Sequence, residues 1–292
     1  MKNDMNEYLI KAESRILAHL QTNRVSKTIE EASSYSIKAG GKRFRPYLLF
    51  AALESLGADL EKGVGAAAAV EMVHTYSLIH DDLPAMDDDD YRRGEPTNHK
   101  VYGEAAAILA GDTLLTESFH LITLDTRLDP KQKVEIISQL SEKAGQNGMI
   151  GGQMLDIEAE GKNITFNELE DIHHYKTGQL IVLPIKIACI IAEASDSVME
   201  PLLEFGDKLG ILFQIRDDIL DVEGNLETTG KETGSDARKN KMTYVRTYGL
   251  EGAKKELDKL TGEAETILHS LADEIDISHL DRVLQRFAVR DK

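Results

Sequence analysis

The 292-residue sequence contains one cysteine, Cys189, and few aromatic residues. A single cysteine cannot form a disulfide within the chain, so a disulfide-stabilised scaffold is excluded and a reducing cytoplasm is favoured. Because Cys189 lies in the apolar run Leu183–Ile191, we expect a small buried hydrophobic residue rather than a nucleophile. Aromatic residues make up only 5% of the chain, and alternating apolar and polar runs bounded by turns are missing. Extended β-sheets are therefore not expected.

The chain also has little positive charge and no long uncharged apolar run. Its 34 Lys and Arg face 51 Asp and Glu, which gives a formal net charge of −17. General attraction to nucleic acids or anionic membranes is therefore not expected, and an anionic substrate would need a local group of cations. The longest apolar run, Leu180–Ala192, is interrupted by Pro184 and Lys186, so no transmembrane helix is predicted. The first residues lack the apolar stretch of a secretory signal, which favours a cytoplasmic protein.

Helical periodicity runs through most of the chain. Apolar residues recur at three- and four-residue spacing, which predicts helices over Glu7–Leu20, Arg45–Leu56, Gly63–His80, Gly103–Leu121, Pro130–Gly148, Phe166–Lys176, Gln179–Ala192, Met199–Leu220 and Leu250–Leu271. No Pro/Ser-rich linker separates two halves of the sequence. We therefore expect an all-α protein of roughly ten helices in a single domain over residues 1–292.

Two clusters of aspartates each follow an apolar helical run. The first contains Asp81, Asp82 and Asp87, and the second contains Asp217 and Asp221. In a helix, residues four apart share a face, so the carboxylates of the second cluster lie side by side. Crowded oxygen ligands suit hard divalent cations, and Mg²⁺ prefers one or two carboxylates together with substrate phosphates. The two clusters therefore indicate Mg²⁺-assisted diphosphate chemistry.

Each of these patterns has a plainer interpretation. A lone acidic run such as Asp87–Asp90 is more often a solvated face, although a second cluster argues against this. EF-hand loops do not fit, because neither cluster alternates Asp with other residues and closes on Glu. His74 alone would more often be a helix histidine with satisfied hydrogen bonds. Gln153 and Asp156 could equally be hydrogen-bonding residues between helices.

Two polar loops carry cations. The first, residues 39–46, combines two glycines, Gly40 and Gly41, with three cations, Lys42, Arg43 and Arg45. Glycines let backbone amides approach a phosphate, and Lys and Arg supply charge and forked donors, although a basic loop alone is usually ordinary surface. The second, residues 224–241, could be a flexible lid that brings ammonium groups to a phosphate.

Five motifs together carry a family resemblance. They are Gly-Gly-Lys-x-x-Arg-Pro at 40–46, Asp-Asp-x4-Asp at 81–87 followed by Arg-Arg, Gly-Gly-Gln-x-x-Asp at 151–156, Lys-Thr at 176–177 and Phe-Gln-x-x-Asp-Asp-x-x-Asp at 213–221. With them the chain resembles the trans-isoprenyl diphosphate synthases, most closely the bacterial farnesyl type, of which the four-residue spacer with Pro84 is typical. The resemblance implies an all-α, isoprenoid synthase-type bundle around a deep central cavity, with the two aspartate motifs facing each other across its mouth, and a homodimer.

The resemblance also implies an enzyme and its reaction. An allylic diphosphate, dimethylallyl or geranyl, ionises; isopentenyl diphosphate attacks the cation, and loss of a proton gives farnesyl diphosphate. Three Mg²⁺ are implied, two held by Asp81 and Asp87 with Asp82 near, and a third by Asp217 with Asp221. The implied partners are small isoprenyl diphosphates, without nucleic acid or a membrane span.

The same resemblance assigns the remaining residues to substrates. It places isopentenyl diphosphate on Lys42, Arg45, His74 and Arg93, and the allylic diphosphate on Arg92, Lys176, Thr177, Gln214, Lys231 and Lys241. It gives catalytic roles to Asp81, Asp87, Lys176, Thr177, Gln214, Asp217 and Lys231. Tyr76 and Ser77, five and four residues before Asp81, are expected to set product length, with Tyr76 as the floor. At the C-terminus, Arg290 or Lys292 could close over isopentenyl diphosphate.

Four rival functions remain open. A geranylgeranyl or longer-chain synthase would share every motif named above. A terpene cyclase would not need the isopentenyl diphosphate residues and typically replaces the second aspartate cluster. A non-catalytic regulatory subunit should have lost an aspartate, and none is missing. An acidic Mg²⁺- or Ca²⁺-binding helical protein would leave the sets of cations unexplained.

Overall fold

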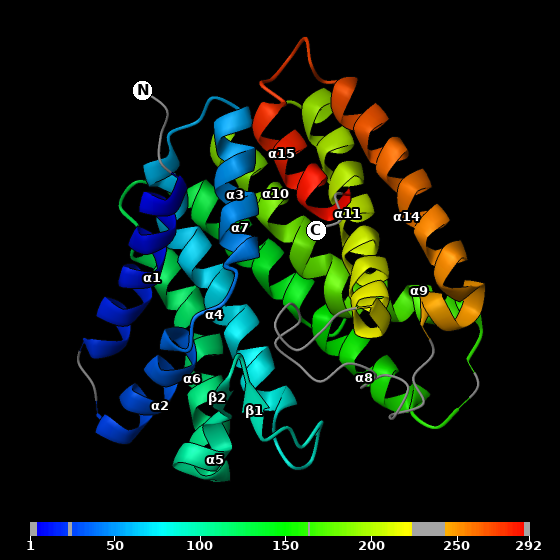
Figure 1. Ribbon diagram of the computed structural model, residues 1–292. Coiled ribbons are helices and arrows are strands. Elements are labelled where there is room, and N and C mark those ends of the chain that lie inside the picture. Colours follow the sequence, from blue (N-terminus) through cyan, green and yellow to red (C-terminus); the bar gives the residue numbers. More distant parts are fainter. Residues whose placement is uncertain (1–4, 23–24, 163, 224–242, 289–292) are drawn as a thin grey trace. The chain divides into compact units, whose positions relative to one another are not determined.

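The computed structural model describes residues 5–22, 25–162, 164–223 and 243–288, which are predominantly helical (Figure 1). The first helices are α1 (Met5–Gln21), α2 (Lys27–Lys38), α3 (Phe44–Ser55), the 3₁₀ turn η1 (Leu60–Gly63), α4 (Val64–Asp81), α5 (Asn98–Tyr102), α6 (Glu104–Thr123) and α7 (Pro130–Ala144). They are followed by α8 (Met149–Ala159), α9 (Phe166–His173), the π-helical turn η2 (His174–Gly178), α10 (Gln179–Ala192), α11 (Asp196–Glu223), α14 (Tyr244–His269) and α15 (Ser278–Ala288). The all-α prediction is confirmed.

The extended structure in the described part of the chain is a small antiparallel hairpin. Its strands, β1 (Tyr91–Arg92) and β2 (Glu95–Pro96), pair Tyr91 with Pro96 and Arg92 with Glu95. The hairpin turns at Arg93 and Gly94, both of which have positive φ. It therefore fixes the direction in which the two consecutive arginines leave the backbone.

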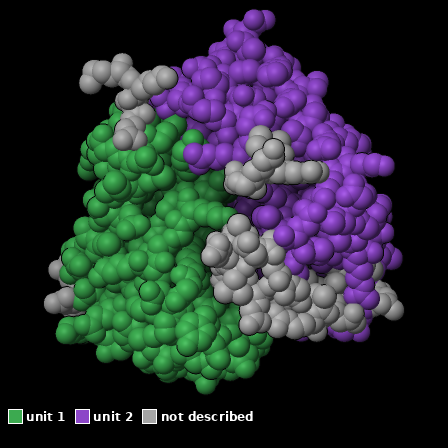
Figure 2. Space-filling model, in the orientation of Figure 1, with its two compact units in different colours: residues 1–50, 59–137 green, residues 51–58, 138–292 purple. Residues whose placement is uncertain are grey.

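The chain divides into two compact units (Figure 2). Unit 1 comprises residues 1–50 and 59–137, and unit 2 comprises residues 51–58 and 138–292. Helices α3 and α7 each contribute residues to both units. The single-domain expectation is not tested by this division and stays a prediction.

Unit 1 is built around α4. This helix packs against α1 and α6, and α2 packs against α6. The alanines at 66–69 are at most 1% exposed, so they give α4 a smooth surface that neighbouring helices can approach closely. The burial of residues 66–69 holds α4 in place, and the last residue of α4 is Asp81.

Unit 2 is built around α10 and α11. Helix α11 packs against both α10 and α14, and nearly every residue of α10 is buried. Cys189 is 2% exposed, as expected, and burial raises the pKa of its thiol to about 12. The helical run Phe166–Ala192 is long and apolar enough to cross a membrane by composition, but 72% of its most apolar window is buried in the protein. A core helix explains that composition.

Candidate active site

The first aspartate motif begins where α4 ends in unit 1. The amide of Asp87 donates to the carbonyl of Asp81 at 2.8 Å, and the amide of Asp88 donates to the carbonyl of Leu83 at 3.2 Å. These bonds fold the four-residue spacer back on itself, so the backbone at the last aspartate of the motif returns to the first. The side chains of Asp81 and Asp87 are both partly exposed.

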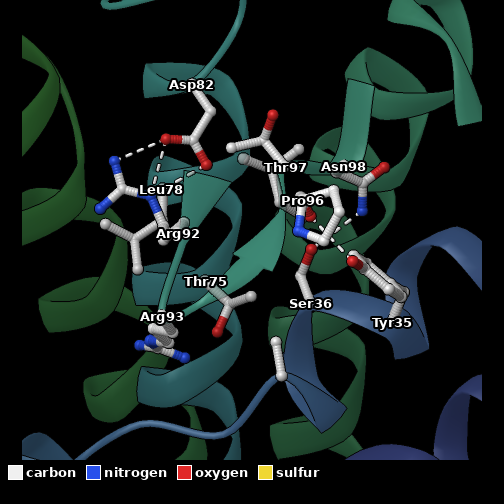
Figure 3. Close-up of a pocket in the computed structure, with 12 residues that line it drawn as sticks. Tyr35, Ser36, Thr75, Leu78, Asp82, Arg92, Arg93, Pro96, Thr97 and Asn98 are labelled. Atoms are coloured by element: carbon white, nitrogen blue, oxygen red, sulfur yellow. Dashed lines mark hydrogen bonds and ion pairs between the residues drawn. The ribbon is translucent and has the colours of Figure 1, made fainter. Parts of the chain in front are cut away.

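Asp82, by contrast, is buried and holds Arg92. The Nε of Arg92 donates to both carboxylate oxygens of Asp82, at 2.7 and 2.9 Å, and an Nη lies 2.5 Å from one of them (Figure 3). Burial, the largest single influence, would lower the pKa of Arg92, but the hydrogen bond to Asp82 and the negative charges of Asp82, Asp89 and Asp81 together outweigh it, and the pKa is raised. The structure therefore places Asp82 as the anchor of Arg92, and its role as a metal ligand stays a prediction.

Arg43, to which the sequence analysis gave no separate role, organises the basic loop before α3. Arg43, with φ of 47°, donates to Glu13 at 2.8 and 3.1 Å and to the buried Glu71 at 2.8 Å. It also donates to the carbonyl of Gly40 at 3.0 Å. Because these bonds hold the loop in one conformation, they also position the residues next to Arg43, which include the exposed Lys42. The only sequence signal was an acid, Glu71, inside an otherwise apolar helix.

Arg93 lies directly against the same loop. Its guanidinium donates to the carbonyl of Gly40, and a Cβ at position 41 would lie 2.5 Å from the Cζ of Arg93. Gly41 also has φ of 132°, a conformation that side chains disfavour. The backbone angle therefore favours a glycine at position 41, and a side chain there would also displace the guanidinium of Arg93.

Several cations surround His74 in unit 1. Burial, together with the nearby charges of Arg45 and Arg93, holds the pKa of His74 well below its usual range, so its ring is neutral at pH 7. Burial lowers the pKa of Arg45 to about 10, and its buried Nε has no hydrogen-bond partner. An unsatisfied buried guanidinium N–H beside further arginines is a costly arrangement that an anion would relieve. The structure brings Arg45, His74 and Arg93 together, and their use for isopentenyl diphosphate stays a prediction.

The two predicted length-determining residues lie one turn above the motif in α4. Tyr76 is 4% exposed, its ring meets that of His80 edge-on at 5.7 Å, and its buried hydroxyl has no hydrogen-bond partner. Burial raises the pKa of Tyr76 to about 12. The hydroxyl of Ser77 donates to the carbonyl of His74 at 2.8 Å. Tyr76 is thus a rigid buried ring, whereas Ser77 is turned back onto its own helix.

A small pocket lies between α2, α4 and the hairpin (Figure 3). It is lined by side chains that include Thr75, Asp82, Arg92, Arg93 and Thr97. Its volume is about 30 Å³, which suits one or two water molecules rather than a prenyl chain. The expected deep cavity is not this pocket and stays a prediction.

In unit 2, Lys176 and Thr177 lie in the π-helical turn η2. The Nζ of Lys176 is 2.6 Å from an oxygen of Asp156 in α8, and Gln214 Nε2 in α11 donates to Thr177 Oγ1 at 3.1 Å. Two glycines let neighbouring helices approach this turn. A Cβ at Gly152 would lie 2.1 Å from the backbone nitrogen of Lys176, and a Cβ at Gly210 would lie 2.9 Å from the Cα of Gly178. π-Helical turns such as η2 are frequent at functional sites.

The second aspartate motif is at the C-terminal end of α11. Asp217 is exposed and Asp221, one turn later, is partly exposed. Asp218 is 7% exposed and accepts a 2.7 Å hydrogen bond from the amide of Tyr244. Asp217 and Asp221 are therefore accessible to solvent, whereas the buried Asp218 stabilises the start of α14. Lys231, Lys241, Arg290 and Lys292 lie outside the described residues.

The donor chemistry of both motifs fits Mg²⁺. Among the described residues, ligand atoms of three His, Cys, Asp or Glu side chains lie within 4.8 Å of one another at His19, Glu117 and His120, none of which belongs to either motif. Each motif would therefore supply one or two carboxylate oxygens and leave the remaining positions to water and phosphate, which is the ligand set that Mg²⁺ prefers.

Comparisons with known proteins show the family to which the chain belongs. Residues 26–275 match the polyprenyl synthetase family. The chain is 54% identical to the farnesyl diphosphate synthase of Micrococcus luteus over 234 residues, 80% of each protein, and 44% identical to that of Bacillus subtilis over 96% of this chain and 94% of the relative. A crystal structure of the Helicobacter pylori geranyltransferase, complexed with magnesium and isoprenyl diphosphate, superposes with a TM-score of 0.85 at 33% identity, covering 98% of each chain. The chain belongs to the polyprenyl synthetase family.

Proposed function

We propose that this protein is a Mg²⁺-dependent prenyltransferase that condenses isopentenyl diphosphate head to tail with dimethylallyl or geranyl diphosphate to form farnesyl diphosphate. The observation that carries the proposal is the arrangement in unit 1. A partly exposed pair of carboxylates, Asp81 and Asp87, adjoins a cluster of buried or half-buried arginines through the ion pair of Asp82 with Arg92. Carboxylates suit the cations that accompany a diphosphate, and guanidinium groups bind the diphosphate itself.

Isopentenyl diphosphate would be held by cations without metal. Arg45 and Arg93 offer forked N–H donors, and Lys42 adds an exposed ammonium group. His74, kept neutral by its surroundings, offers a hydrogen bond without adding a further charge. The buried Nε of Arg45, which lacks a partner, is the donor that we expect the diphosphate to satisfy.

The allylic diphosphate would be bound through Mg²⁺ and by direct contacts with cationic side chains. Asp81, Asp87, Asp217 and Asp221 would hold Mg²⁺, which when bound stabilises the charge on the departing diphosphate. Arg92, anchored by Asp82, and Lys176, anchored by Asp156, would add direct contacts to its oxygens. Because Lys176 is held by a carboxylate, its ammonium group is positioned before the substrate arrives.

Ionisation leaves a carbocation that needs nearby dipoles but no strong nucleophile. Thr177 and Gln214 fix each other through their hydrogen bond, so their oxygens can be oriented toward the cation at no further entropic cost. No side chain needs to act as a strong base, because the released diphosphate can accept the proton that is lost.

We further propose three Mg²⁺ per site, a cytoplasmic location and a homodimer. The exposed apolar residues Ile108 and Leu109 on α6 support the homodimer.

The test is a reaction of the purified chain with isopentenyl and geranyl diphosphates, with and without Mg²⁺. Dephosphorylated products would be separated by chromatography. We expect farnesol as the main product and none after chelation of the metal. A twenty-carbon or longer main product would favour the geranylgeranyl or longer-chain alternative, and absence of any product with Mg²⁺ present would favour a non-catalytic subunit.

A further inference from the structure

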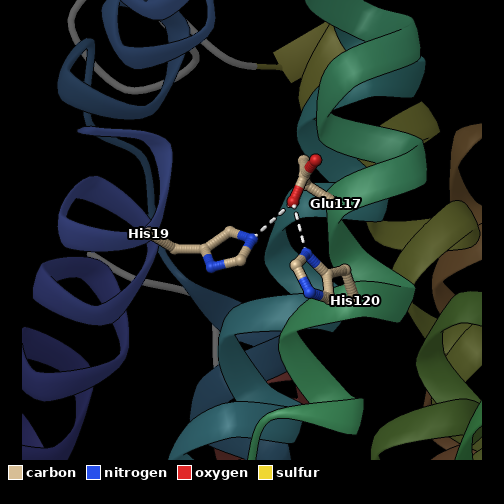
Figure 4. A group of neighbouring side chains, drawn as sticks. All are labelled: His19, Glu117 and His120. Atoms are coloured by element: carbon tan, nitrogen blue, oxygen red, sulfur yellow. Dashed lines mark hydrogen bonds and ion pairs between the residues drawn. The ribbon is translucent and has the colours of Figure 1, made fainter. Parts of the chain in front are cut away.

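Three side chains with metal-binding atoms meet in unit 1, at a place that the proposed reaction does not use (Figure 4). His19 comes from the last turn of α1, and Glu117 and His120 come from the second half of α6. Glu117 Oε2 lies 2.7 Å from His19 Nε2 and 3.1 Å from His120 Nδ1. All three ligand atoms lie within 4.8 Å of one another.

The helices hold this triad in place from both sides. Glu117 and His120 are three residues apart, so they project from the same face of α6. The two imidazole rings contact each other edge-on, with centroids 5.4 Å apart and planes at 68°. Helix α6 therefore fixes the positions of Glu117 and His120, and the packing of the two rings fixes the position of His19.

We propose that His19, Glu117 and His120 form a binding site for a transition-metal dication of the Zn²⁺ type, which links α1 to α6. Zn²⁺ binds imidazole nitrogen at about 2.0–2.1 Å and carboxylate oxygen at about 2.0–2.2 Å, so ligand atoms around a tetrahedral ion lie roughly 3.3 Å apart. The two contacts of Glu117 are slightly shorter than that distance. Small side-chain rotations would open them enough for an ion, and the fourth position would hold water.

The ligand types distinguish this site from the aspartate motifs. Two imidazoles and one carboxylate suit Zn²⁺ and its neighbours in the periodic table, whereas Mg²⁺ takes oxygen ligands. The carboxylate oxygen that contacts both histidines supplies the third ligand atom.

The site is also reachable. The side chain of His120 is 56% exposed and that of Glu117 is 36% exposed, whereas His19, at 10%, lies beneath them. An ion can enter from solvent on the α6 side and bind the less exposed histidine, His19, last. Bound there, it would strengthen the link between α1 and α6 that the hydrogen bond between His19 and Glu117 already makes.

The experiment is a Zn²⁺ titration of the full-length protein by competition with a chromophoric chelator. Mg²⁺ at millimolar concentration is kept present so that the aspartate motifs are occupied. We expect one tight equivalent in the wild type, at least about 100-fold weaker binding in His120→Gln and in His19→Gln, and no change in His269→Gln. His269 is an exposed histidine in α14 and serves as the matched control.

Co²⁺ provides a second readout of the ligands themselves. A four-coordinate site with two imidazoles gives intense visible absorption, whereas six oxygen ligands give weak absorption. The intense bands should persist in Asp217→Ala and disappear in His120→Gln. Equal Zn²⁺ affinity in wild type, His120→Gln and His19→Gln, or only weak Co²⁺ bands in the wild type, would overturn the proposal. The use of one variant in each helix, each checked by circular dichroism, keeps the test valid if one of them misfolds.

Discussion

Asp217 and Asp218 are consecutive in α11 but have opposite surroundings. Asp217 is exposed, whereas Asp218 is buried and accepts a hydrogen bond from the amide of Tyr244, the first residue of α14. One carboxylate is therefore available to a soluble ion, and the other belongs to the packing of two helices. The motif read from the sequence treats these neighbours alike, but their substitution should have different effects.

Asp217→Ala should lower turnover by a factor on the order of 10²–10⁴ and leave the stability of the fold almost unchanged, because an exposed Mg²⁺ ligand is lost. Asp81→Ala should behave in the same way. Asp218→Ala should instead lower the free energy of unfolding by about 1–3 kcal/mol, because the buried amide of Tyr244 loses its acceptor. Steady-state kinetics at saturating Mg²⁺ and urea denaturation measure the two effects. Near wild-type turnover in Asp217→Ala would contradict the metal assignment.

The two consecutive arginines should separate kinetically. Arg93→Ala should chiefly raise the KM for isopentenyl diphosphate, because Arg93 lies against the glycine loop. Arg92→Ala should also lower turnover with the allylic substrate, because the buried Asp82 would lose its ion pair with Arg92. Arg92→Lys is the matched control, since an ammonium group keeps the charge but not the two-pronged geometry, and should recover only part of the loss. Indistinguishable profiles for Arg92→Ala and Arg93→Ala would defeat this division.

Two glycines test whether the π-helical turn depends on close backbone approach. A methyl group at Gly152 would meet the backbone nitrogen of Lys176 at 2.1 Å, whereas one at Gly262 in α14 would meet nothing within 4 Å. Gly152→Ala should therefore destabilise the protein by roughly 1–3 kcal/mol and also reduce turnover by displacing Lys176. Gly262→Ala should stabilise it by up to about 1 kcal/mol, since alanine favours a helix. Equal melting temperatures for the two variants would argue against a tight contact at η2.

The sequence predicted most long helices because their apolar residues are periodic, but it missed α2, α5, α8 and α15. In α2, Ser33 and Ser34 are buried, so polar residues occupy positions where the pattern needs apolar ones. In α8, Gly151 and Gly152 are poor helix formers that weaken the helical pattern, although Gly152 allows the close approach of the backbone at Lys176. Both misses have the same cause: the residue serves a neighbouring element, and tertiary packing overrides its local preference.

The candidate residues that the sequence could indicate are those that form clusters of charge. Clustered aspartates and paired arginines are conspicuous in the sequence, and helical geometry puts Asp217 and Asp221 on one face of their helix. The roles of Arg43 and Asp82 did not follow, because each depends on a partner distant in sequence or on burial. Arg43 reaches Glu13 and Glu71, and only the fold shows that these acids surround it.

Tyr76 offers the sharpest test of product length. We expect Tyr76→Ala to shift the main product from fifteen carbons to twenty or longer, because it removes a buried ring one turn above the first aspartate motif. Tyr76→Phe is the matched control. It removes only a buried hydroxyl that has no hydrogen-bond partner, so it should keep the fifteen-carbon product and equal or exceed wild-type stability. Truncation to alanine leaves a cavity that costs about 3–5 kcal/mol, so folding of that variant is checked by circular dichroism before its products are analysed. Chromatography of the dephosphorylated products decides the question, and an unchanged fifteen-carbon product from folded Tyr76→Ala would show that this ring is not the floor.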